Sequence, residues 1–128
     1  MKKSILIIIF ILLTVSSYAG KYSTTVNAAD EYGNTPLSTA IYNENLDMIK
    51  LLLNNKMDPN TVTDEYYGTT LFMWAISRDD NELAKLLIKK GANVNSLNYQ
   101  NLSVLGYTQN TETIKFLLNN GLDPNATD

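Results

Sequence analysis

The sequence contains neither cysteine nor histidine among its 128 residues. The absence of cysteine excludes disulfide bonds, thiolate nucleophiles and thiolate metal sites. The absence of histidine removes the most common general base and the most common metal ligand. Glycine-rich phosphate loops, catalytic triads and metal-ligand spacings are also missing. We therefore expect a protein that is not an enzyme and that uses no cofactor and no metal ion.

Composition and charge further narrow the class of protein and the partners it can have. The chain is 45% hydrophobic and 18% charged, which is typical of a globular protein, and its length favours one domain. Its formal net charge is −3. Because an acidic surface repels phosphate backbones, we expect no nucleic-acid partner.

The first nineteen residues have the layout of a secretory signal peptide. Lys2 and Lys3 form a positive start, residues 5–15 form an unbroken apolar run, and Ser17-Tyr18-Ala19 is a small-x-small cleavage site. The alternative is an uncleaved membrane anchor. A spanning helix needs about 20 apolar residues, and this run is much shorter. The sequence predicts a signal peptide over 1–19 and cleavage after Ala19.

Cleavage would leave residues 20–128 as a single domain. Its net charge would change from −3 to −5, because Lys2 and Lys3 are the only charged residues removed. The remaining sequence has no second long apolar run, so we expect no stable membrane insertion after cleavage.

The stretch from Gly33 to Asn60 predicts a pair of short helices. Thr35-Pro36 is a helix start, with a hydroxyl cap and a proline at the first helical position. The polar break at 43–45 separates two apolar stripes of helical spacing, and Asp58-Pro59-Asn60 supplies turn residues that end the second. Such a pair is too small to bury its apolar faces alone, so it needs copies of itself.

The rest of the chain supplies those copies. Residues 68–95 repeat the pattern at the same length, with Thr70 and Phe72 in register with Thr35 and Leu37. A third copy, residues 101–125, is three residues shorter around Thr108. We expect its first helix to be short or frayed. The period of 33 to 35 residues is typical of a helical repeat protein.

These motifs resemble the ankyrin-repeat family. Residues 30–60 carry DEYGNTPLSTA, NLDMIKLLL and DPN, residues 65–95 carry KKGANVN, and residues 98–125 fit loosely. The resemblance implies an all-α solenoid of stacked helix–turn–helix pairs with β-hairpin-like fingers. Lys56 occupies a position where the family has glycine. If its backbone is left-handed, the strain costs about 1 kcal/mol.

The resemblance also directs attention to the fingers, which in this family project outward and commonly contact partners. Tyrosines gather there just before the glycine position, and tyrosine is enriched in protein interfaces. The alternative is that these rings only stiffen the stack of fingers. Carboxylates in the first two fingers would favour a basic partner. The predicted partner-binding residues are Asp30, Glu31, Tyr32, Asp64, Glu65, Tyr66, Tyr67 and Tyr99.

Two other features have plainer interpretations. Trp74 could anchor a partner, but its place on the first helix of the second repeat favours the core. Asp79, Asp80 and Glu82 could serve acid–base chemistry or bind calcium. They lack the spacing of a calcium loop, so we expect solvated surface.

We therefore predict a monomeric, non-enzymatic module that binds a protein partner through its finger loops and the adjacent concave face. The short signal with two lysines favours export in a bacterium, to the periplasm or the medium. One alternative is a secreted effector or inhibitor of a host or competitor protein. Another is a piece of a longer ankyrin-repeat protein.

Overall fold

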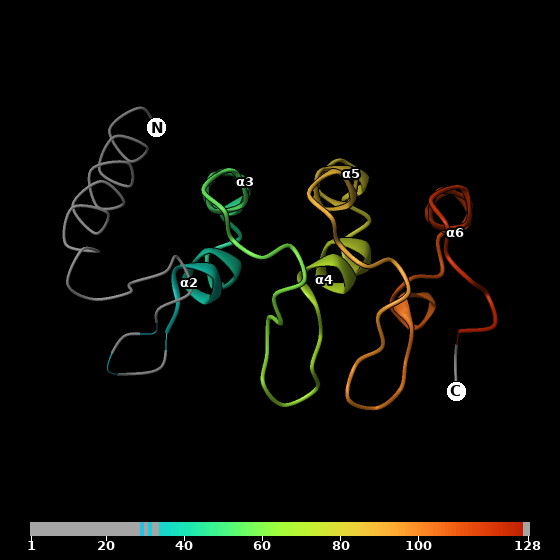
Figure 1. The fold of residues 1–128 in the computed structure, drawn as a ribbon, viewed down its shortest axis with the longest axis horizontal. Helices are drawn as coiled ribbons and strands as arrows, with labels where there is room; N and C mark the ends of the chain where they lie inside the picture. Colours follow the sequence, from blue (N-terminus) through green and yellow to red (C-terminus); the bar gives the residue numbers. More distant parts are fainter. Residues whose placement is uncertain (1–28, 30, 32–33, 127–128) are drawn as a thin grey trace. The chain divides into compact units, whose positions relative to one another are not determined.

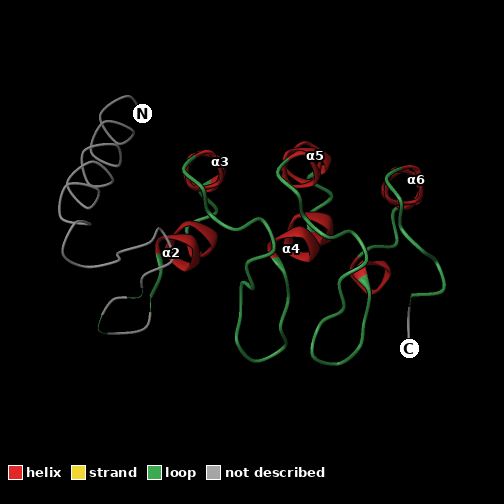
Figure 2. Ribbon diagram, viewed as in Figure 1, coloured by secondary structure: helices red, strands yellow, loops and turns green. Residues whose placement is uncertain are grey.

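A computed structural model describes residues 29, 31 and 34–126 of the chain (Figure 1). Within these residues the regular structure is helical, and β pairing is limited to one isolated antiparallel bridge between Val62 and Thr70 (Figure 2). The predicted all-α class, built from helix pairs with hairpin-like loops, is confirmed. The chain divides into two compact units, residues 1–57 and 58–128. The predicted leader, residues 1–19, lies outside the described residues.

The first unit contains helices α2 (Pro36–Tyr42) and α3 (Leu46–Asn54), which pack against each other. Thr35 caps α2 as predicted. Its hydroxyl accepts from the Ser38 N–H at 3.0 Å, and the Ser38 hydroxyl accepts from the Thr35 N–H at 2.8 Å. This reciprocal pair satisfies two backbone N–H groups that the helix itself leaves unbonded.

The end of α3 confirms that the backbone of Lys56 is left-handed, with φ of 69°. The following N–H, of Met57, donates back to the Leu52 carbonyl at 3.1 Å, and the Met57 side chain is buried. Gly91 and Gly121 end the second helices of the other two repeats with φ of 101° and 90°. In the first repeat, Lys56 therefore adopts the left-handed conformation that glycine adopts at the same position of the other two repeats.

The second unit contains α4 (Leu71–Ser77), α5 (Asn81–Lys89), the 3₁₀ helix η1 (Val104–Tyr107) and α6 (Thr111–Asn119). α4 packs against both α5 and η1. Its core side chains include several with no exposed surface: Leu71, Met73, Ile76, Leu83, Leu87, Val104 and Leu117. η1 is a single short turn, which confirms the prediction of a reduced first helix in the third repeat.

No helix within the described residues is long and apolar enough to cross a membrane.

Candidate binding site on the finger loops

The second finger, residues 61–71, is a short hairpin that projects from the helices of the second unit (Figure 1). The Val62–Thr70 bridge marks its base. Nearer the tip of the hairpin, the Thr63 N–H donates to the Thr69 carbonyl at 2.7 Å, and the Thr63 hydroxyl donates to the same carbonyl at 2.9 Å. β-branched threonine suits this extended backbone. The hairpin therefore holds its tip in a defined position.

Asp64 shapes the tip from inside the loop. Its Oδ1 accepts the Tyr67 N–H at 2.6 Å, and its Oδ2 accepts the Thr69 N–H at 3.3 Å. Partial burial alone would raise the pKa of Asp64, but hydrogen bonds from Tyr67, Thr69 and Tyr66 stabilise the carboxylate and lower the pKa below its usual value. The carboxylate of Asp64 is thus engaged by its own loop.

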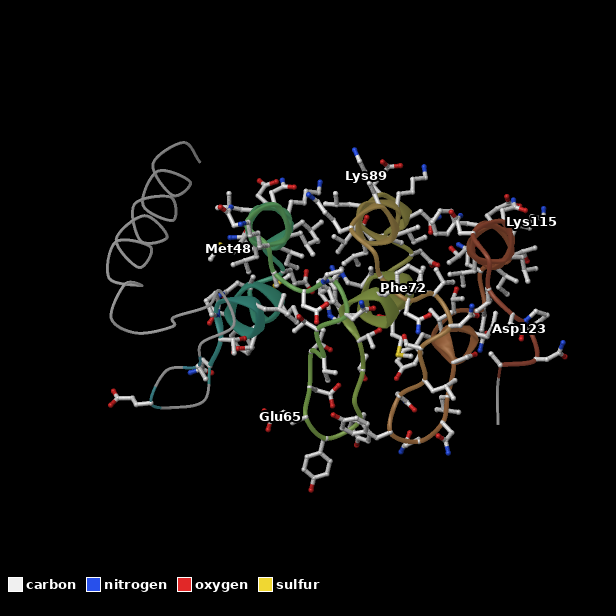
Figure 3. The ribbon with its side chains drawn as sticks, in the orientation of Figure 1. Met48, Glu65, Phe72, Lys89, Lys115 and Asp123 are labelled. Carbon is white, nitrogen blue, oxygen red and sulfur yellow. The ribbon has the colours of Figure 1, made fainter. Side chains whose placement is uncertain are left out.

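The loop presents two aromatic side chains to solvent. Tyr66 is 88% exposed and Tyr67 is 53% exposed. Their ring centroids lie 5.9 Å apart with the planes tilted by 54°, a distance at which aromatic rings attract each other. Glu65 is also exposed, and Figure 3 shows it near the end of the loop. Glu65, Tyr66 and Tyr67 form what we call the tip patch.

Tyr99 lies on the third finger, the loop between α5 and η1, and contacts the second finger. Its N–H donates to the Tyr67 carbonyl at 2.8 Å, and its ring lies directly over Gly68. A Cβ atom on Gly68 would overlap that ring, and the φ of 68° there also favours glycine. The Tyr99 side chain is nevertheless 67% exposed. Tyr99 therefore stiffens the pair of fingers while leaving one edge open to solvent.

Two further residues connect the fingers, and the sequence pattern did not single them out. Asn98 is buried, and its Nδ2 donates to the Tyr107 hydroxyl at 2.8 Å. That hydroxyl lies 3.3 Å from the Thr69 hydroxyl of the second finger. Asn98 Oδ1 accepts the N–H groups of Gln100 and Leu102, as Asp64 does in its own loop. The signal that could have identified Asn98 is an asparagine in a turn, because its side-chain oxygen can accept nearby backbone N–H groups and so organise the loop.

The first finger is only partly described. Glu31 is exposed in the first unit, whereas Asp30 and Tyr32 lie outside the described residues. The second unit brings together the other five predicted residues, Asp64, Glu65, Tyr66, Tyr67 and Tyr99.

The acidic cluster after α4 consists of Asp79, Asp80 and Glu82, and two of the three make hydrogen bonds that stabilise the fold. Asp80 caps α5 by accepting the Leu83 N–H at 3.0 Å. Asp79 Oδ1 accepts from the hydroxyl of Thr113, at 2.8 Å, and Thr113 is fully buried on α6. Asp79 and Glu82 are both exposed, and Glu82 pairs with Lys85 at 3.0 Å, as solvated surface would. Within the described residues, no group of acidic side chains is arranged to hold a metal ion.

Trp74 corrects one expectation. We expected it in the core, but it is half-buried, and the Arg78 guanidinium carbon lies 5.0 Å from the ring centroid. Residues four apart on a helix lie on the same side, so Arg78 lies over the indole ring. Phe72 and Met73 fill the core position instead.

Comparison with known proteins agrees with the repeat pattern. Residues 56–128, more than half of the chain, match a family model of ankyrin repeats in three copies. Residues 24–67 match a second model, of ankyrin repeats in many copies.

Several viral proteins named as ankyrin repeat proteins are similar to this chain. One from Acanthamoeba polyphaga mimivirus is 33% identical over 85 residues, covering 66% of this chain and 22% of that protein. A second from the same virus is 32% identical over 103 residues, covering 78% of this chain and 13% of its own length. One from Fowlpox virus (strain NVSL) is 34% identical over 88 residues, covering 68% of this chain and 12% of that protein. The chain thus spans less than a quarter of the length of these relatives.

Proposed function

The chain belongs to the ankyrin-repeat family, whose repeats are protein-interaction modules, and from that premise we propose that it is a non-enzymatic binding protein that engages its partner through the tip patch. The observation that carries this proposal is the exposure of Tyr66, which is 88% accessible on a loop that is otherwise held by hydrogen bonds. A large ring on a rigid loop contributes contact area and loses little conformational freedom on binding.

The charges around the tip patch indicate the kind of partner. From Asp58 to Ser77 the chain has no lysine or arginine, while it has Asp58, Asp64 and Glu65. Figure 3 shows Lys89 and Lys115 on the far side of the second unit from Glu65. Charge complementarity would therefore favour a partner with a basic side chain at the contact, able to pair with Glu65 and lie against a tyrosine ring.

Affinity capture tests this proposal. The tagged chain and its Tyr66→Ala/Tyr67→Ala variant are recovered from native cells with their bound proteins. Tyr42→Ala is the matched control, because Tyr42 is also 88% exposed but lies on α2 and is not part of the tip patch. We expect the double variant to lose a partner that the wild type and the control retain, with the far-UV circular dichroism of all three unchanged. Equal recovery by the double variant would remove the tip patch from the interface.

We also propose that the protein acts outside the cytoplasm. Support comes from the sequence of residues 1–19, with Lys2-Lys3, the apolar run and the Ala19 cleavage site. Fractionation of native cells, with N-terminal sequencing of the product, tests this. We expect a chain that starts at Gly20 in the periplasm. The same chain in the medium would favour the effector or inhibitor, and an uncleaved chain in the cytoplasm would contradict export.

A further inference from the structure

Asn120, which caps the end of α6, is the only asparagine in the sequence that is followed by glycine. The residue is exposed, and its Nδ2 donates to the Phe116 carbonyl at 2.7 Å, which closes the last turn of the helix. Gly121 follows with φ of 90°, and a Cβ added there would meet no atom within 4 Å. The backbone after Asn120 is therefore open to solvent on the side where other residues carry a side chain.

An asparagine before a glycine can react with its own backbone. A base from the medium, such as hydroxide, takes the proton of the Gly121 N–H, and the nitrogen attacks Cγ of Asn120. The N–Cγ bond forms, the Cγ–Nδ2 bond breaks, and ammonia leaves a succinimide ring. Water then opens the ring at either carbonyl and yields aspartate or isoaspartate. Glycine favours ring closure because it has no side chain in the way and its backbone is free to reach the required geometry.

The two reacting groups are held only by bonds of a helix end. The Gly121 N–H donates to the Leu118 carbonyl at 3.3 Å, which is long for a backbone hydrogen bond, whereas the corresponding bond from Gly91 measures 3.0 Å. Helix ends open at a low cost in free energy. One such opening frees the Asn120 carboxamide and the Gly121 N–H together.

Asn55 provides a matched comparison in the first repeat. It caps α3 with φ of −104°, close to the −105° of Asn120, and it is also exposed. Its Nδ2 donates to the Leu51 carbonyl at 2.7 Å, the same distance as in the α6 cap. The residue that follows is Lys56, however, and not glycine. The lysine side chain and its restricted backbone oppose ring closure, so Asn55 has the same cap without the same reactivity.

We propose that Asn120 is a site of spontaneous deamidation in the folded protein, at which the end of α6 changes as the protein ages. The formal net charge of the chain falls from −3 to −4, because a neutral amide becomes a carboxylate. That carboxylate lacks the N–H that the Phe116 carbonyl accepts, and it stands at the negative end of the helix dipole, so the cap does not re-form.

Isoaspartate has a second effect, because it lengthens the backbone directly before Gly121. The Gly121 carbonyl accepts from Asn95 Nδ2 at 3.0 Å, which ties the end of α6 to the preceding repeat. A longer backbone displaces that carbonyl, so the modification loosens the third repeat for as long as the chain exists. This site is separate from the tip patch and does not depend on the proposed function.

Ageing of the purified full chain at neutral to mildly alkaline pH tests the proposal. Peptide mapping by mass spectrometry detects each deamidation as a gain of about 1 Da, and isoaspartyl methyltransferase labels the isoaspartate product. We expect Asn120 to be modified at least about tenfold faster than Asn55, a barrier difference of about 1.4 kcal/mol or more. Gly121→Ala should slow the reaction of Asn120, although its strained backbone makes the helix end open more often.

Lys56→Gly is the reciprocal variant, because it places a glycine after Asn55. It should make Asn55 react about as fast as Asn120. Relief of the left-handed strain at residue 56 should make this variant no less stable than the wild type, so its new reactivity cannot come from unfolding. Equal rates at Asn120 and Asn55 in the wild type, or an Asn55 that stays unreactive in Lys56→Gly, would overturn the proposal. Reaction of Asn120 only in urea would overturn it too, because the folded helix end would then be protective.

Urea denaturation measures the consequence for the fold. The aged chain should unfold at a lower midpoint than the fresh chain, and so should Asn120→Asp, which has the product's charge from the start. Asn119→Asp is the matched control, because it adds the same charge at the neighbouring exposed residue and leaves the cap in place. A fully deamidated chain with an unchanged midpoint, or an Asn120→Asp effect no larger than that of Asn119→Asp, would contradict the loosening of α6.

Discussion

Replacing Lys56 with glycine should stabilise the first helix pair. Lys56 follows α3 with a φ of 69°, a left-handed conformation in which the Cβ of an L-residue crowds the backbone. At the equivalent positions the second and third repeats have Gly91 and Gly121, with φ of 101° and 90°. The first repeat therefore bears a backbone strain that the other two avoid.

The expected gain follows from two opposing terms. Relief of the left-handed strain is worth about 1–2 kcal/mol. Glycine also makes the unfolded chain more flexible, which opposes folding by about 0.5–1 kcal/mol. The net gain for Lys56→Gly is then about 0.5–1 kcal/mol. The Lys56 side chain is exposed, so little packing is lost with it.

Two matched variants isolate the backbone effect. Lys56→Ala removes the long side chain but keeps the Cβ, so it should leave stability within about 0.5 kcal/mol of the wild type. Gly121→Ala makes the opposite change at a site where an added Cβ meets no atom within 4 Å. It should therefore cost about 1 kcal/mol through backbone strain alone.

Urea denaturation followed by far-UV circular dichroism measures all three variants. The midpoint should rise for Lys56→Gly and fall for Gly121→Ala, with unchanged denaturant dependence. A midpoint that rises equally for Lys56→Ala and Lys56→Gly would place the effect in the side chain and refute the argument from strain.

Two further predictions concern the second finger. Gly68→Ala should destabilise the protein by about 1–3 kcal/mol, because the new Cβ meets the Tyr99 ring in a strained backbone; Tyr99→Ala should recover part of that loss in a double-mutant cycle by urea denaturation. Asp64 has a lowered pKa, so its contribution is present above the ordinary value of 3.8 and is lost as the pH falls through the lower, folded value. NMR titration of the Tyr67 amide should show a midpoint below 3.8, and Asp64→Asn should abolish that transition; a midpoint at or above 3.8 would contradict the assigned hydrogen bonds.

The local features of the fold could be predicted from the sequence because they depend on neighbouring residues. Thr35 and Thr70 cap their helices as the pattern indicates, since a hydroxyl reaches an N–H three residues ahead. The shortened helix η1 follows from three missing residues in the third repeat. These outcomes need no knowledge of distant parts of the chain.

Contacts between repeats were not predictable in the same way. The Asn98–Tyr107–Thr69 chain joins residues up to 38 positions apart, and the Asn60 carboxamide accepts an N–H 33 positions ahead. Such partners are selected by the stacking of repeats, which no local pattern encodes. Trp74 illustrates the same limit, because its partial exposure depends on how α4 is oriented among its neighbours.

The candidate site was predicted as a set of residues but not as an arrangement. Their composition indicated an interface, yet Asp64 proves to be an internal organiser of its loop and Tyr99 a brace over Gly68. Contacts within the fingers then separate the members: Asp64 and Tyr99 are engaged by neighbouring loop residues, although Tyr99 stays 67% exposed, and Glu65, Tyr66 and Tyr67 form the exposed tip patch.

A binding titration of the captured partner measures how much the tip patch contributes to affinity. Affinities are compared for the wild type, the Tyr66→Ala/Tyr67→Ala variant and the Tyr42→Ala control. If the tip patch is the interface, loss of the two rings should weaken binding by at least about 30-fold, which corresponds to about 2 kcal/mol, while Tyr42→Ala stays within about twofold of the wild type. A double variant that binds as tightly as the control would contradict the account.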